Sequence, residues 1–120
     1  MTLDFSVVTD AWQSLVYGTL GTLFLAVAGM MIATVIGVLG VAILRTNMAI
    51  PSFLVTAFVE VIRNTPFLVQ IYFIFFALPL AGIRLNPTMT AVIALGLNGG
   101  AYAIEIIRGG VESVPHGQTE

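Results

Sequence analysis

Three long stretches without a charged side chain constrain this sequence more than any other feature. Residues 15–44, 64–83 and 85–104 lack Asp, Glu, Lys and Arg over 30, 20 and 20 positions. A helix of about 20 apolar residues is long enough to cross a bilayer. Soluble domains carry roughly a quarter charged residues, whereas this chain of 120 residues carries 8%. We therefore predict an all-α, multi-pass transmembrane helix bundle.

The composition also excludes several function classes. The chain has no cysteine, which excludes disulfide scaffolds and thiol nucleophiles. Its single histidine, His116, cannot form a multi-histidine metal site. No basic stretch is present for binding nucleic acid, and no nucleotide loop, HExxH motif or nucleophile–base pair is found. We expect no enzyme activity, no catalytic or metal-binding residues, and no cofactor in this chain.

Proline and glycine positions predict where the spans begin and end. We place three spans at about 15–44, 53–79 and 87–108, and a polar tail at 109–120. Pro66 falls inside the second span, where the missing N–H and the ring clash predict a kink over residues 64–67.

The ends of the second and third spans carry further signals. Pro79 predicts that the second helix stops there. Asn86 is a good N-cap, with Pro87 at the first helical position of the third span. Gly109 and Gly110 are expected to loosen or end that span.

The arginines predict an orientation in the membrane. With the N-terminus outside, Arg45, Arg63 and Arg108 lie on the inner side and Arg84 lies outside. Cytoplasmic loops are richer in basic residues, so this orientation is favoured.

Small residues recur at a spacing of four in the first and third spans. Such rows let neighbouring helix backbones approach closely, so we interpret them as packing faces of a bundle. The rows are Gly18, Thr22 and Ala26; Gly29, Ala33 and Gly37; and Gly96 and Gly100.

Polar residues share one face of the third span. Asn98, Tyr102 and Glu105 fall within an arc of about 60° at about 100° per residue. Polar groups in hydrocarbon are costly, so this face should look into the bundle or a wet cavity. A substrate path is one interpretation; the other is structural, with Glu105 pairing with Arg108 three residues on.

The second span leaves a similar choice open. Arg63 can pair with Glu60, or it can face the same side as Gln70, seven residues later. A kink at Pro66 frees carbonyls that need partners or must line a cavity, and discontinuous membrane helices are frequent at transport sites. Alternatively, Glu60 and Arg63 only mark the cytoplasmic end of the span.

Two segments resemble a known family. Residues 60–70 have the sequence EVIRNTPFLVQ, and residues 98–120 have NGGAYAIEIIRGGVESVPHGQTE. Both resemble the polar amino acid permeases of bacterial ABC importers, of the histidine and glutamine type. The second segment includes the start of their "EAA" coupling loop, and the resemblance covers about residues 18–120.

The resemblance implies a type I importer fold with five spans, of which three are present, and an external N-terminus. It implies a second permease subunit, identical or related, and cytoplasmic ATPases that hold ATP and Mg²⁺. It also implies an extracytoplasmic solute-binding protein, a polar amino acid substrate and the bacterial inner membrane. The expected ATPase-coupling residues are Pro115, His116, Gly117, Gln118 and Glu120, where His116 replaces a common lysine.

We expect the substrate path to use Arg63, Thr65, Gln70, Asn98, Tyr102 and Glu105. Because the sequence stops inside the coupling signature, we expect a piece of a permease that cannot form a working pore alone. The competing interpretation is a small helical membrane interaction or assembly protein without transport activity. Which amino acid is carried stays open at this point.

Overall fold

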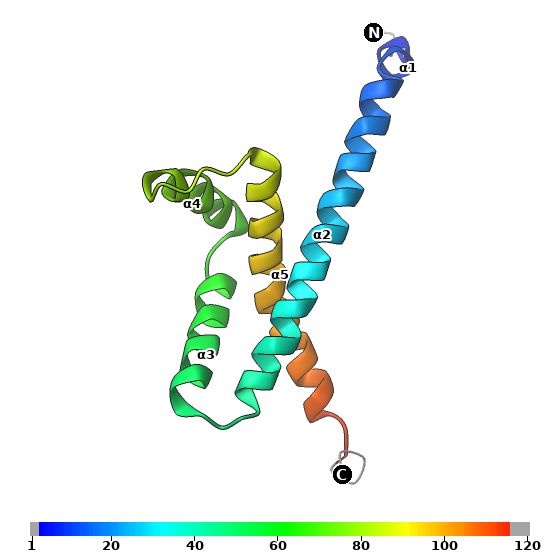
Figure 1. Cartoon of the computed structure of the whole chain (residues 1–120). Coiled ribbons are helices and arrows are strands. Elements are labelled where there is room, and N and C mark those ends of the chain that lie inside the picture. Colours follow the sequence, from blue (N-terminus) through cyan, green and yellow to red (C-terminus); the bar gives the residue numbers. More distant parts are fainter. Residues whose placement is uncertain (1–2, 116–120) are drawn as a thin grey trace.

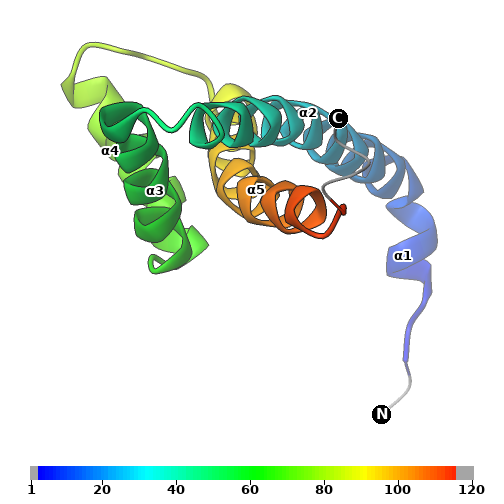
Figure 2. The same cartoon turned by 90° about the horizontal axis from the view of Figure 1, so that it is seen from below.

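The computed structural model describes residues 3–115, and these residues form helices only. A short helix α1 (Ser6–Asp10) leads into the long α2 (Trp12–Leu44), followed by α3 (Ala49–Arg63), α4 (Phe67–Leu80) and α5 (Pro87–Glu112) (Figure 1). The all-α fold class predicted from the sequence is confirmed. Seen from below, α3 and α4 lie on one side of the crossed pair α2 and α5 (Figure 2).

Close packing of glycine against branched side chains joins α2 to α5. Gly37 and Gly100 are buried in this interface. A Cβ on Gly37 would lie 2.7 Å from the Cβ of Ala103, and one on Gly100 would lie 2.6 Å from Cγ2 of Ile36. The rows that contain Gly37 and Gly100 are therefore packing faces, as predicted. The row that begins at Gly18 is not, because Gly18 has open space around it among the described residues.

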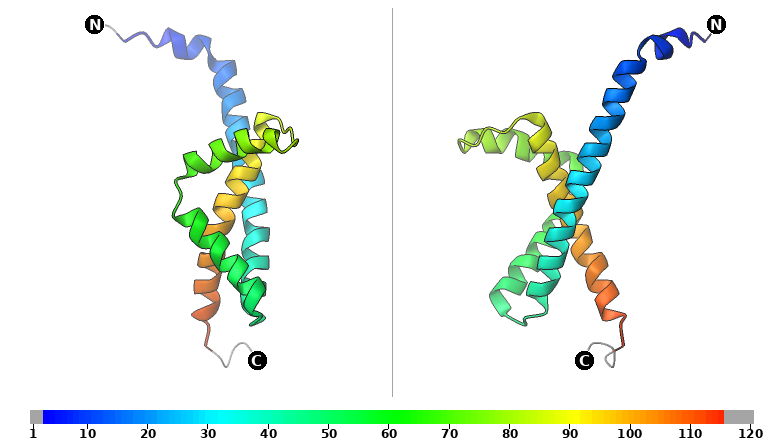
Figure 3. Two further views of the ribbon diagram at one scale, coloured as in Figure 1. Left: turned by 90° about the vertical axis from the view of Figure 1, so that its left-hand side faces the viewer. Right: turned by 45° about the vertical axis from the view of Figure 1, so that its right-hand side comes forward.

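The predicted second span is broken into two helices. Between α3 and α4 the chain changes direction by 109°, so the expected kink at residues 64–67 is a full break. We call this region, residues 62–70, the elbow. Figure 3 shows α3 rising alongside α5 and α4 running across α5, against which both helices pack. The span predicted at about 53–79 is therefore two helices that meet where the kink was expected.

The start of α5 forms as predicted. The Met89 N–H donates to Oδ1 of Asn86 at 2.7 Å, and Pro87 occupies the first turn. Gly82, with φ of 88°, provides the left-handed turn in the loop that precedes it.

Two helices end slightly later than predicted. Pro79 lies inside α4, which ends at Leu80, because a proline so near the end removes only one helical hydrogen bond. The helix α5 continues past Gly109 and Gly110 to Glu112. Mid-helix glycine costs only about 1 kcal/mol, and the pair between Arg108 and Glu112 at 3.2 Å supports the last turn.

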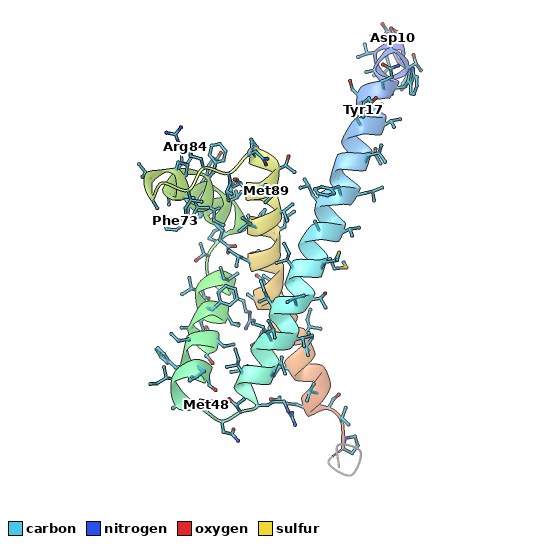
Figure 4. The ribbon with its side chains drawn as sticks, viewed as in Figure 1. Asp10, Tyr17, Met48, Phe73, Arg84 and Met89 are labelled. Carbon is cyan, nitrogen blue, oxygen red and sulfur yellow. The ribbon has the colours of Figure 1, made fainter. Side chains whose placement is uncertain are left out.

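By length and composition, α2 and α5 can each cross a membrane, and the bent pair α3 and α4 can count as a third span. Figure 4 shows which residues lie at each end of the α2–α5 pair. Towards one end lie Asp10, Tyr17, Arg84 and Met89, and towards the other lies Met48.

Replacing Gly37 with Leu is expected to destabilise the chain by about 1–3 kcal/mol, because overpacking forces the helices apart. The Cβ would also lie 3.2 Å from the backbone carbon of Ala103. The measurement is unfolding in mixed micelles with increasing SDS, followed by circular dichroism.

Gly21→Leu is the matched control, since no atom lies within 4 Å of a Cβ there. Its effect should stay within about 0.5 kcal/mol. Equal losses in the two variants would contradict close packing between α2 and α5.

Candidate functional site

The elbow forms around a hydrogen bond that proline cannot make. In an unbroken helix the carbonyl of Ile62 would accept the N–H of residue 66, but Pro66 has none. The side chain of Gln70 replaces it: Nε2 donates to the carbonyl oxygens of Ile62 and of Thr65, each at 2.8 Å. A residue of α4 thereby caps the end of α3.

Two further carbonyls near the end of α3 are also bonded. Asn64 Nδ2 donates to the backbone oxygen of Glu60 at 2.7 Å, and Thr65 Oγ1 donates to that of Val61 at 2.7 Å. The carboxylate of Glu60 accepts from Asn64 at 3.3 Å. Arg63 pairs elsewhere, so the possible pairing of Glu60 with Arg63 does not form.

Arg63 instead forms an ion pair with another helix. Its guanidinium lies 3.6 Å from Oε2 of Glu105 on α5, and Arg108 lies 3.7 Å from Oε1 of the same carboxylate. The side chains of Arg63 and Glu105 are 45% and 36% exposed. One of the predicted alternatives, the pairing of Glu105 with Arg108, therefore exists together with a cross-helix contact that the sequence analysis missed.

The polar face of α5 is only partly covered by the other described helices. We use this name for Asn98, Tyr102 and Glu105. The helix α2 covers the side of α5 that carries Gly96 and Gly100, while Leu97 faces the elbow. Asn98 is half-buried and Tyr102 is 44% exposed.

A groove borders this polar face on one side. Tyr102 lines a groove of about 390 Å³ between α2 and α5, together with Met30 and Thr34 of α2. Neither Asn98 nor Tyr102 makes a side-chain hydrogen bond to another described residue. The face therefore offers an amide, a phenol and a carboxylate to a partner outside the described structure.

The six residues expected to line the path divide into two groups. Arg63 and the polar face lie together, joined by the ion pair. The side-chain donors of Thr65 and Gln70 bond backbone carbonyls near the end of α3, and Gln70 is only 8% exposed. Their place on a substrate path stays a prediction.

The coupling residues fall at the edge of the described structure. Pro115 follows the end of α5, whereas His116, Gly117, Gln118 and Glu120 lie outside the described residues. Within residues 3–115, no cluster of three or more His, Cys, Asp or Glu side chains is placed to hold a metal ion.

The chain is similar to curated proteins over all or part of its length. It is 38% identical to the glutamine transport system permease protein of Escherichia coli strain K12, over all of this chain and 56% of the relative. It is 51% identical over 65 residues to the L-cystine transport system permease protein of Bacillus subtilis, covering 54% of this chain and 28% of the relative. No family model matches the chain.

A solved structure has the same fold. A crystal structure of an amino acid ABC transporter with histidines superimposes with a TM-score of 0.91 at 30% identity, over 98% of this chain and 55% of that one. The chain thus spans about half the length of the proteins it matches. By sequence and by fold, it belongs with the amino acid ABC transporter permeases.

Proposed function

We propose that this chain forms part of the substrate path in the permease subunit of an ATP-driven importer for polar amino acids. The observation that carries the proposal is the partly exposed polar face of α5, with Arg63 paired with Glu105 at 3.6 Å. Ionisable groups within membrane segments are costly and typically line substrate or ion paths. The names of the related permeases, for glutamine and cystine, support amino acids as the substrate class.

The ion pair suggests how an amino acid is recognised. Glu105 offers a carboxylate to the substrate ammonium, and Arg63 offers a guanidinium to its carboxylate. Half-exposed pairs contribute only about 0–1 kcal/mol, so a zwitterion carrying both charges can replace the contact at little cost. Asn98 and Tyr102 supply neutral donors and acceptors beside it.

Transport itself requires partners that supply energy and substrate. We propose cytoplasmic ATPases holding ATP and Mg²⁺, a second permease subunit and an extracytoplasmic solute-binding protein. Nucleotide and binding protein would bias two states of the bundle by differential binding. The tail with Pro115, His116, Gly117, Gln118 and Glu120 is the proposed ATPase contact, on the inner side of the bacterial inner membrane, with the N-terminus outside.

The variant Glu105→Gln should change the stability of the isolated chain by less than about 1 kcal/mol, since both its ion pairs are partly exposed. SDS unfolding in micelles measures this. A loss of several kcal/mol would assign Glu105 a structural role.

A chimera tests transport directly. This chain replaces the matching residues of the E. coli glutamine permease, which is co-expressed with its own ATPase and binding protein. We expect ATP-dependent uptake of labelled glutamine, and at least a tenfold loss with Glu105→Gln at equal membrane levels, because the carboxylate partner of the substrate is lost.

Asp10→Asn is the control, since this carboxylate ends α1, near the start of α2 and far from Glu105 (Figure 4). Uptake should be unchanged in it. Full uptake by a chimera carrying Glu105→Gln would overturn the proposed path.

A further inference from the structure

We propose that Gln70 is a positioning residue: its two side-chain N–H groups latch α4 to the end of α3 and set the angle of the elbow. This inference concerns the joint and does not depend on which substrate is carried. It gives Gln70 a role other than touching the substrate.

The latch replaces a backbone hydrogen bond that is missing at Pro66. The carbonyl of Ile62 has lost its normal partner at Pro66, and the N–H of Thr65 reaches it only at 3.3 Å. The amide nitrogen of Gln70 lies closer, at 2.8 Å, and bonds the carbonyl of Thr65 as well. Both of its N–H groups are therefore used on the elbow.

The amide oxygen of Gln70 takes no part in the latch. Oε1 of Gln70 is buried and has no hydrogen-bond partner among the described residues. An acceptor at this position would face the carbonyl oxygens of Ile62 and Thr65, which are themselves acceptors. A side chain of the same shape without N–H groups cannot perform the task.

Few alternatives exist if the latch is lost. The groove beside Gln70, of about 410 Å³, is lined mainly by apolar side chains. Within a membrane, freed carbonyls next to such a surface cannot turn to bulk water. The elbow is then expected to leave its present angle so that these carbonyls find other partners.

The rest of the structure indicates which helix would move. The helix α3 is held on α2 and α5 by packing of Val59 against Val41 and Ile104, and by the pair between Arg63 and Glu105. The described side-chain hydrogen bonds that reach from α4 to another part of the chain are the two from Gln70. Without the latch, α4 is held by its packing against α5 and not by a hydrogen bond to α3, so the angle between α3 and α4 is free to change.

A distance across the elbow tests the latch. Because the chain has no cysteine, spin labels on Ile50→Cys and Leu80→Cys report without background. Both sites are exposed, at 74% and 90%. At about 1.5 Å per residue, the 109° bend places these positions about 25 Å apart, whereas one straight helix would place them about 45 Å apart.

We expect a narrow distribution near the shorter distance for the full chain in lipid nanodiscs. Gln70→Leu and Gln70→Glu keep the side-chain volume but remove the neutral donors, and both should shift and broaden the distribution towards longer distances. Asn64→Leu removes a side-chain donor from the same elbow without touching the latch, and the carbonyl of Glu60 keeps the backbone N–H of Asn64 at 3.0 Å, so the distribution should be unchanged.

A second label pair, Val38→Cys with Ile106→Cys, verifies that each variant keeps the α2–α5 pair and is folded. An unchanged elbow distance in Gln70→Leu, in a chain whose second pair is also unchanged, would overturn the latch. Because this readout involves no transport, its failure is distinct from a failure of the uptake assay.

Discussion

A missing N–H at Pro66 determines how the second half of this structure is built. In water, the carbonyl that loses its partner would simply be hydrated, but a membrane segment must satisfy it from within the protein. The side chain of Gln70 does so from the next helix. The requirement to bond one carbonyl thus fixes a sharp change of direction in the chain.

That change of direction keeps one side of α5 open. An unbroken helix continuing from α3 would run lengthwise beside α5, whereas α4 bends by 109° and lies across it (Figure 3). The other side of α5 is covered by α2, whose glycines allow close contact. Asn98, Tyr102 and Glu105 lie between the side of α5 covered by α2 and the side contacted by α3 and α4. Arg63, at the end of α3, contacts Glu105 there.

Much of the helical pattern could be predicted from the sequence, because apolar runs, small-residue rows and the Asn86 cap act locally. The site of the break was also predictable from Pro66. Its size was not, because backbone geometry at a proline permits a range of angles and the contact of Gln70 with Ile62 selects one. The interpretation that Arg63 and Gln70, seven residues apart, face the same side assumed one continuous helix. The break at the elbow removes that continuity. In retrospect, a side-chain amide four residues after the proline was the available signal.

The cross-helix pair of Arg63 with Glu105 was beyond sequence reasoning for a different reason. Helical spacing identifies neighbours on one helix, such as Glu105 and Arg108, but it does not say which helices meet. That information comes from the glycine contacts and the elbow together, which set where α3 ends relative to α5.

The central claim is that the polar face of α5 borders a water-filled path and not lipid. Cysteine accessibility in the assembled chimera measures this most directly, using a membrane-impermeant thiol reagent on Tyr102→Cys and on Phe73→Cys, an exposed aromatic position of α4 (Figure 4). The account predicts rapid modification of the cysteine at position 102, slowed by substrate, and slow modification at position 73. Equal, slow modification at both positions would contradict it.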